Sequence, residues 1–249
     1  SLLNKPLIIH EQNSLPGLTN RILAKLADKI MLGFPNAIHA DPAKTIFSGN
    51  PVRSEIAQID LPQQRFYGRE GRLNILVIGG SLGAQVLNTV VPEALKSMAE
   101  QHRPFIVHQV GDRHLDTARQ RYADLQVRGE VLAFIENMAE RYAACDLVLC
   151  RAGALTIAEL SAAGVASILV PYPHAVDDHQ TCNALFLARA GAAILVPQQE
   201  FTAQKLTELL THLTREKLLN MAMMARSLAK PDAAAVVAEV CVELSGAAA

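Results

Sequence analysis

VIGGSLGAQVLN, residues 77–88, decides the fold of this chain. An apolar run ends here in Gly79 and Gly80, and Ser81 and Gly83 follow directly before a helical pattern. Glycines allow positive φ and close approach of the backbone to a ligand, while the start of a helix presents unpaired N–H groups and a partial positive charge. The stretch matches neither the dinucleotide-binding GxGxxG pattern nor the GxxxxGK[ST] P-loop. It predicts a strand–loop–helix turn that holds a phosphate, with a tight turn that binds no ligand as the alternative.

Short apolar runs alternate with amphipathic stretches on the C-terminal side of this turn. The runs are too continuous for strands with one wet face, which indicates a parallel sheet covered on both sides. A β–α repeat of this spacing predicts a doubly wound α/β domain with right-handed crossovers. The predicted strands are 73–78, 104–110, 130–135, 146–150, 166–171 and 192–197, and the predicted helices are 84–99, 114–125, 137–144, 155–163, 179–190, 202–213 and 215–228.

The first fifty residues differ from this repeat. PLIIHEQNSLPGLTNRILAKLADKIMLGF predicts a strand, a loop, a helix and a strand, a unit that cannot bury its own faces. We therefore expect it to be the end of a larger domain, with further sequence preceding Ser1. The polar stretch 53–72 has scattered turn residues typical of a linker. A last helix is predicted after Pro231, with Asp232 in its first turn.

Composition restricts the class of protein. The chain has 249 residues, of which 50% are hydrophobic, enough for one large or two small domains with a core. Its net charge of -1 does not favour a nucleic-acid partner. The four cysteines have no CxxC spacing and are interpreted as reduced core thiols. With no apolar run of about 18 residues and no cleavable leader, we expect a soluble, cytoplasmic chain.

A second glycine-containing turn occurs at 150–164, CRAGALTIAELSAAG. Ala154, Leu155 and Thr156 begin a predicted helix whose N-terminus can face an anion. Glu159 lies one turn further, where its carboxylate can accept hydrogen bonds from two sugar hydroxyls. The alternative is that Glu159 only interacts favourably with the helix dipole.

Three polar loops also follow predicted strands. HEQN at 10–13 and SGNPVR at 48–53 are two of them. The third, at 171–184, has DDH followed by Gln180, and its acidic and histidine residues imitate a metal site without a second ligand group at useful spacing. Asp178 is a plausible N-cap, so we expect no metal, and Gln180 is the better binding candidate. Several polar strand ends together favour one shared cleft.

Six segments together resemble the MurG family, the peptidoglycan N-acetylglucosaminyltransferases that make lipid II from lipid I. They are HEQNSLPGLTNRILAKLADKI, GNPVR, VIGGSLGAQVLN, CRAGALTIAELSAAG, ILVPYPHAVDDHQTCNA and LARAGAA. The resemblance implies a GT-B fold of two Rossmann-like domains that face each other across a cleft. By this resemblance residues 1–53 are the end of the N-terminal acceptor domain, 54–230 the UDP-GlcNAc-binding domain, and 231–249 a helix that packs back on the acceptor domain.

Nine positions match donor contacts of the family, namely Asn13, Arg53, Ser81, Ile135, Ala154, Leu155, Thr156, Glu159 and Gln180. The resemblance places Arg53 and Ser81 near the diphosphate and nucleotide, and the amides of 154–156 on the phosphates. It assigns uracil to the backbone of Ile135 and the ribose hydroxyls to Glu159.

By the same resemblance Gln180 holds the GlcNAc hydroxyls, and Asn13 reaches the donor from the opposite domain. Some members have two consecutive glutamines where this chain has His179 and Gln180. An imidazole cannot reproduce the donor and acceptor pair of an amide, so no sugar contact is assigned to His179.

The implied chemistry is inverting transfer without a cofactor. The C4 hydroxyl of the muramyl sugar of undecaprenyl-pyrophosphoryl-MurNAc-pentapeptide attacks the anomeric carbon of UDP-GlcNAc, and UDP leaves. Helix N-termini and Arg53 can stabilise the leaving charge without a metal, in keeping with the absence of a DxD triplet. The whole enzyme is expected to associate peripherally with the cytoplasmic face of the bacterial inner membrane.

The family's expected histidine base falls in the N-terminal part that precedes this sequence, so no catalytic residue is assigned here. We expect the chain alone to bind UDP-GlcNAc and to turn over nothing. Two alternatives stay open: another GT-B enzyme or a UDP-GlcNAc 2-epimerase, against which HEQN and GGSLGA argue, and a nucleotide-sugar-binding module without catalysis.

Overall fold

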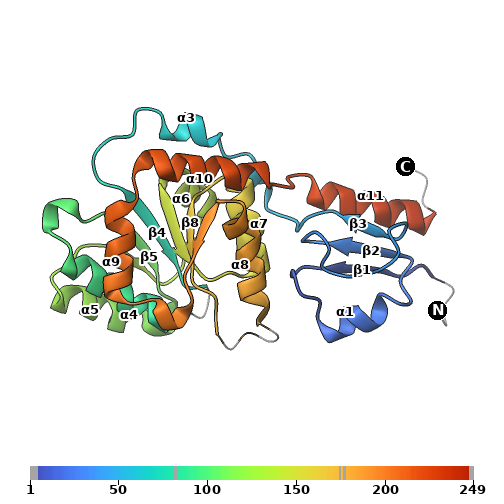
Figure 1. Ribbon diagram of the computed structural model, residues 1–249, viewed down its shortest axis with the longest axis horizontal. Coiled ribbons are helices and arrows are strands. Elements are labelled where there is room, and N and C mark those ends of the chain that lie inside the picture. The colour runs from blue at the N-terminus through green and yellow to red at the C-terminus, as the bar shows by residue number, and fades with distance from the viewer. Residues whose placement is uncertain (1–4, 81–82, 174, 176–177, 247–249) are drawn as a thin grey trace.

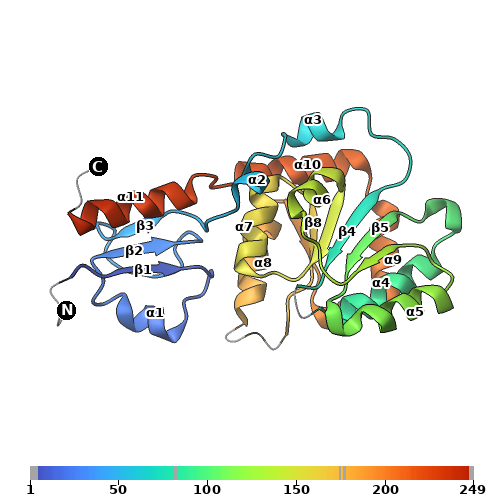
Figure 2. The same ribbon diagram turned by 180° about the vertical axis from the view of Figure 1, so that it is seen from behind.

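The structure is a computed structural model that describes residues 5–80, 83–173, 175 and 178–246. The chain forms two parts that lie side by side (Figures 1 and 2). The smaller part contains both ends of the described chain, and the larger part contains everything between them. The chain passes twice between the two parts, near the positions 53 and 230 where the sequence predicts domain boundaries. The domain boundaries themselves stay a prediction.

The larger part is built on six parallel strands. They are β4 (Asn74–Ile78), β5 (Phe105–Gln109), β6 (Glu130–Leu132), β7 (Leu147–Cys150), β8 (Ser167–Leu169) and β9 (Ala193–Leu195), in the spatial order β6-β5-β4-β7-β8-β9. From β4 the chain adds β5 and then β6 on one side of the sheet. It then crosses to the other side of β4, where it adds β7, β8 and β9 in turn. This reversal makes a switch point between β4 and β7, where open α/β sheets bind ligands at the strands' carboxyl ends.

Helices cover both faces of this sheet, as the continuous apolar runs predict. In β4, Ile75 and Val77 belong to one buried cluster and Leu76 to the other. The first cluster is completed by α4 (Gln85–Ser97), α5 (Leu115–Asp124) and α9 (Ala203–His212), and the second by α6 (Met138–Ala144), α7 (Ala154–Ala163) and α8 (His179–Arg189). The helix α10 (Arg215–Ser227) contributes to both clusters, and short 3-10 turns lie at Glu100–His102, Asp112–His114 and Gln198–Glu200. The predicted doubly wound α/β fold is confirmed.

The smaller part has three parallel strands in the order β1-β2-β3. They are β1 (Ile8–Glu11), β2 (Lys29–Leu32) and β3 (Thr45–Phe47). The helices α1 (Leu18–Leu23) and α11 (Ala233–Ser245) lie on opposite sides of these strands in both views (Figures 1 and 2). The last helix of the chain therefore lies beside its first strands.

The segment 53–72, predicted to be a linker, contains two short helices instead. These are α2 (Ser54–Ala57) and α3 (Pro62–Phe66). Ile56 is 1% exposed, and the guanidinium of Arg65 donates to the carbonyls of Tyr142, Ala163 and Gly164. Few apolar residues suffice here, because Ile56, Ile59 and Phe66 are buried and Arg65 donates hydrogen bonds to carbonyls of the larger part.

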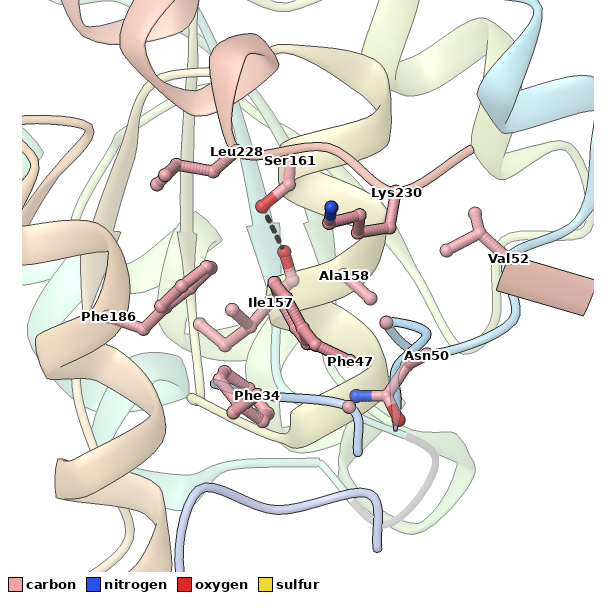
Figure 3. A pocket seen from close by; sticks show the side chains of 12 residues that line it. Phe34, Phe47, Asn50, Val52, Ile157, Ala158, Ser161, Phe186, Leu228 and Lys230 are labelled. Atoms are coloured by element: carbon pink, nitrogen blue, oxygen red, sulfur yellow. Dashed lines mark hydrogen bonds between the residues drawn. The ribbon is translucent and has the colours of Figure 1, made fainter. Parts of the chain in front are cut away.

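The two parts meet at an apolar junction (Figure 3). Phe34 from the smaller part and Phe186 of α8 contact edge to face, with ring centroids 5.2 Å apart. The chain crosses outward after Gly49 and returns at Lys230, and a Cβ on Gly49 would lie 2.4 Å from Cβ of Lys230. The two crossings therefore run side by side. Among the described residues no helix is long and apolar enough to cross a membrane.

Candidate functional site

The glycine-rich turn lies at the switch point, between the end of β4 at Ile78 and the start of α4 at Gln85. Gly83 has a φ of +74°, and a Cβ added there would lie 2.1 Å from the carbonyl oxygen of Val110. No other residue fits at this position, because both the backbone conformation and the space exclude a side chain. Ser81, predicted to contact the donor, lies outside the described residues.

An open groove of about 740 Å³ begins at this turn. Its walls come from the turn itself, the first half of α4, the residue after β7 and the loop before α8. It is lined by Gly79, Gly83, Ala84, Gln85, Val86, Thr89, Val90, Arg151, Tyr172, Gln180 and Gln198. The structure thus brings the predicted Gln180 together with the glycine-rich turn.

The side chain of Gln180 is held in one orientation. Its Oε1 accepts hydrogen bonds from the backbone amides of Tyr172, at 3.0 Å, and Ala152, at 3.3 Å. Because these two bonds occupy Oε1 of Gln180, its side-chain NH₂ is the group that can donate a hydrogen bond to a ligand.

Arg151 is a groove residue that sequence reasoning missed. Its Nη1 donates to the carbonyls of Val170 and Pro171, its Nη2 donates to Oε1 of Gln198 at 2.6 Å, and its guanidinium lies over the ring of Tyr172. Burial lowers the pKa of Arg151 from its usual value. Its position directly after a buried strand at the switch point was the available sequence signal.

The helix α7 begins at the carboxyl end of β7, across the switch point from the glycine turn. Ala154, Leu155 and Thr156 form its first turn, as predicted, and its N-cap residue, Gly153, has no side chain to cap the first amides. Leu155 is 49% exposed, which keeps this end of the helix open. The first N–H groups of α7 can therefore hydrogen-bond an anion.

Glu159 is bound on both oxygens. Its Oε1 accepts from Nη2 of Arg53 at 3.3 Å, and its Oε2 accepts from the hydroxyl of Tyr142 at 3.1 Å. No acidic residue lies in the first turn of α7, so the alternative that Glu159 serves only the helix dipole is wrong. The structure instead joins two residues that were predicted separately, Arg53 and Glu159.

Asn13 meets the larger part through a residue that the sequence did not reveal, Asn183 of α8. Nδ2 of Asn183 donates to Oδ1 of Asn13 at 3.1 Å and to the carbonyl of Ala152 at 3.3 Å. Its Oδ1 accepts from the backbone amide and from the hydroxyl of Ser14, both at 2.9 Å. Asn183 is fully buried, and these bonds join the HEQN loop to α8 beside Gln180.

Buried Glu11 shapes the same loop from within the smaller part. Its Oε1 accepts from the backbone amide of Asn13 at 2.9 Å, and its Oε2 accepts from the amide of Gly17 and from Asn20. The position of Asn13 is thus fixed by a carboxylate on one side and by Asn183 on the other.

Ile135 lies apart from the groove, in the segment between β6 and α6. Its side chain is 4% exposed and belongs to the buried cluster that contains Tyr142. Only its backbone can face a ligand, which is the kind of contact predicted for it. Ile135 is not among the residues that line the groove of Gln180.

The described residues contain no group of three or more histidines, cysteines, aspartates or glutamates that could hold a metal ion. Asp178 occupies the N-cap position of α8 but makes no capping bond to the backbone, and its Oδ1 accepts from the hydroxyl of Thr181. All four cysteines are free; Cys145 and Cys150 are buried as expected, whereas Cys241 is exposed on α11.

Comparison with known proteins places this geometry in a family. Residues 74–238 match the model of the glycosyltransferase family 28 C-terminal domain. A UDP-N-acetylglucosamine–N-acetylmuramyl-(pentapeptide) pyrophosphoryl-undecaprenol N-acetylglucosamine transferase of Nitrosomonas europaea is 59% identical, over 98% of this chain and 69% of the relative. The transferase of the same name from Nitrosospira multiformis is 57% identical, over 98% and 68%.

A solved structure agrees with these relatives. The crystal structure of Acinetobacter baumannii MurG superposes with a TM-score of 0.87 at 40% identity, over 97% of this chain and 68% of that one. The likeness extends over both the three-stranded and the six-stranded parts, so the fold is of the GT-B type. The chain belongs to the MurG family of glycosyltransferases.

Proposed function

We propose that this chain provides the donor-binding part of an inverting hexosyltransferase, which transfers GlcNAc from UDP-GlcNAc to the C4 hydroxyl of the muramyl sugar of undecaprenyl-pyrophosphoryl-MurNAc-pentapeptide. The reaction converts lipid I to lipid II in peptidoglycan synthesis. The observation that carries this function is the identity of 57% and 59% with transferases of that name over 98% of the chain.

The donor is proposed to lie across the switch point. The amides of Ala154, Leu155 and Thr156 then face the diphosphate, and Glu159 accepts the ribose hydroxyls. This arrangement is supported by the uncapped start of α7 and by the placement of Glu159 further along the same helix. The backbone of Ile135 is proposed to bind uracil.

The GlcNAc end of the donor is proposed to lie between Gln180 and Asn13. Gln180 has its NH₂ available to donate to a sugar hydroxyl, since its oxygen is held by two backbone amides. Asn13 lies close by because Asn183 joins its loop to α8. Ser81 is proposed to contact the donor from the glycine-rich turn.

The transfer step requires stabilisation of the departing UDP. The acceptor hydroxyl attacks the anomeric carbon on the face opposite the diphosphate, and negative charge grows on the diphosphate as the bond to the sugar breaks. The positive end of the α7 dipole and the guanidinium of Arg53 are the groups proposed to stabilise that charge. The chain spans 68% and 69% of the length of two relatives, and the general base is proposed to come from the remaining part.

The place of action follows from the acceptor, whose undecaprenyl chain is held in the membrane. As a relative of such transferases, the enzyme acts at the membrane. The cytoplasmic face and a peripheral mode of association are proposed, and the partners are UDP-GlcNAc and the lipid-linked acceptor, with no nucleic acid.

Calorimetric titration of the chain with UDP-GlcNAc, UDP-GalNAc and UDP-glucose tests this function. We expect saturable binding that prefers UDP-GlcNAc and is weakened at least about tenfold, to a still measurable affinity, in Glu159→Ala. The matched control is Glu243→Ala, which removes an exposed carboxylate of α11 and is expected to bind like the wild type. Folded protein that binds no uridine diphosphate sugar would overturn the donor-site assignment.

A further inference from the structure

A buried tyrosine, Tyr142, contacts Glu159, the residue whose carboxylate is proposed to bind the donor ribose. Tyr142 of α6 is 1% exposed, and its hydroxyl donates to Oε2 of Glu159 at 3.1 Å. Its ring lies in the same buried cluster as Ile135 and Ile157. The only polar atom of this side chain is thus directed at one partner, at the edge of the core.

The hydroxyl keeps its proton at neutral pH. Burial, together with the negative charge of Glu159, raises the pKa of Tyr142 well above its usual value. Burial also raises the pKa of the neighbouring Cys145 and Cys150 thiols, which leaves them uncharged. Tyr142 is therefore the hydrogen-bond donor to Glu159 in this pair.

The two partners of Glu159 differ in how firmly they are held. The side chain of Arg53 is 53% exposed, and an ion pair of this kind contributes little and is readily exchanged. Tyr142 is fixed by the core and reaches Glu159 from inside the molecule. The tyrosine therefore holds the Oε2 atom of Glu159 from inside the core, whichever group contacts the outer oxygen.

We propose that Tyr142 is a positioning residue, which fixes the Glu159 carboxylate so that it accepts the 2′- and 3′-hydroxyls of the donor ribose together. A carboxylate has about four acceptor sites, of which the tyrosine takes one and leaves the outward ones. Without this anchor the terminal torsion of Glu159 is broad and the carboxylate turns toward Arg53. The inference rests on the proposed function, because it assumes that Glu159 faces a ribose.

The same contact couples two parts of the nucleotide site. Tyr142 lies on the helix that follows the segment of Ile135, the residue proposed to bind uracil through its backbone. The hydrogen bond from Tyr142 therefore links the helix that follows the base-binding segment to the carboxylate proposed for the ribose. A nucleoside diphosphate that lacks ribose hydroxyls cannot use this arrangement.

The test compares UDP with 2′,3′-dideoxy-UDP by calorimetric titration of the complete 249-residue chain. For Tyr142→Phe we expect UDP to bind about tenfold more weakly while dideoxy-UDP binds within about twofold of wild type. In a Glu159→Ala background, Tyr142→Phe should cause no further loss, because the group that it positions is gone.

A matched control is available in Tyr122→Phe. Tyr122 is also buried, at 4% exposed, and its hydroxyl is hydrogen-bonded to Nδ1 of His108 at 3.0 Å in the other buried cluster. This variant loses a core hydroxyl without touching Glu159, so it should keep the wild-type preference for UDP over dideoxy-UDP. Equal weakening of both nucleotides by Tyr142→Phe, or no weakening of either, would overturn the proposal.

A second measurement on the wild-type chain covers the case in which Tyr142→Phe does not fold. The hydroxyl proton resonance of Tyr142 should shift when UDP is added and stay in place with dideoxy-UDP. An unchanged resonance with saturating UDP would contradict the coupling. Wild-type protein that binds no UDP at all would instead overturn the proposed function, and the role of Tyr142 with it.

Discussion

Nδ2 of Asn183 donates to Oδ1 of Asn13 at 3.1 Å, across a separation of 170 residues in the chain. This bond and the two that Ser14 donates to the Asn183 oxygen join the HEQN loop to α8. Replacing Asn183 by Ala removes four hydrogen bonds to buried and half-buried polar groups, and we expect a loss of about 2–4 kcal/mol in the free energy of unfolding. Urea denaturation measures this loss.

Ser14→Ala is the control, because it removes one hydroxyl and should cost only about 1 kcal/mol in the free energy of unfolding. Equal losses for the two variants would count against the central role of Asn183.

Gly83→Ala should be among the most damaging single substitutions in the chain. The new Cβ would lie 2.1 Å from the carbonyl oxygen of Val110, at a φ of +74°. We expect a loss of about 3 kcal/mol or more in unfolding free energy, since the close contact adds to the cost of the left-handed backbone. Gly191→Ala separates the two causes, because Gly191 has a φ of +72° and open space around it. It should cost about 1–2 kcal/mol, and thermal unfolding that ranks the two alike would show that the contact with Val110 relaxes.

Asp146→Asn removes the charge from a fully buried carboxylate. Asp146 accepts from Nη1 of Arg69 at 2.8 Å, from Nη2 of Arg215 at 3.3 Å and from the backbone amide of Asn74 at 2.8 Å. The two guanidinium groups would then lose their buried partner, so we expect a loss of about 3–5 kcal/mol in unfolding free energy.

The exposed pair of Glu130 and Arg141 is the control for this prediction. Glu130→Gln should change unfolding free energy by at most about 1 kcal/mol, because solvent screens the pair. A larger loss in Glu130→Gln than in Asp146→Asn, measured by denaturant titration, would contradict the assignment of Asp146 as a structural anchor.

His108 makes the chain sensitive to acid. Burial lowers the pKa of His108 to about 3, from 6.5 in the unfolded chain. The unfolded state therefore binds the proton first as pH falls, and stability that is fully present above pH 6.5 decreases down to about pH 3. At pH 5 the loss should be on the order of 2 kcal/mol. In His108→Asn, the free energy of unfolding should fall by about 2 kcal/mol less between pH 7 and pH 5 than it does in the wild type. Parallel curves of unfolding free energy against pH for the two proteins would refute the lowered pKa of His108.

Local sequence patterns were sufficient to predict the six-stranded sheet and its two glycine-containing turns. An apolar run long enough to be buried on both faces and a glycine at its end are both local signals. The strand ends were less accurate: β8 stops at Leu169, before the predicted end at 171, where Pro171 has no N–H to extend a ladder.

The candidate site was predicted only in part, for a physical reason. Arg53 and Glu159 could be chosen from their types and their resemblance to the family, but their pairing depends on two elements that are 106 residues apart. Tyr142, Arg151 and Asn183 were missed, because each acts through hydrogen bonds to residues distant in the sequence that exist only in the folded chain. The helices of 53–72 were missed because a short polar segment can be ordered by a single well-placed arginine such as Arg65.

The side-by-side crossings at Gly49 and Lys230 restrict how the two parts can move. Because both connections pass through one place, any displacement of the smaller part relative to the larger part must bend both of them together. Such a displacement must also break the hydrogen bonds that Asn183 makes with Asn13 and Ser14. The same residues that link the two parts therefore also resist their separation.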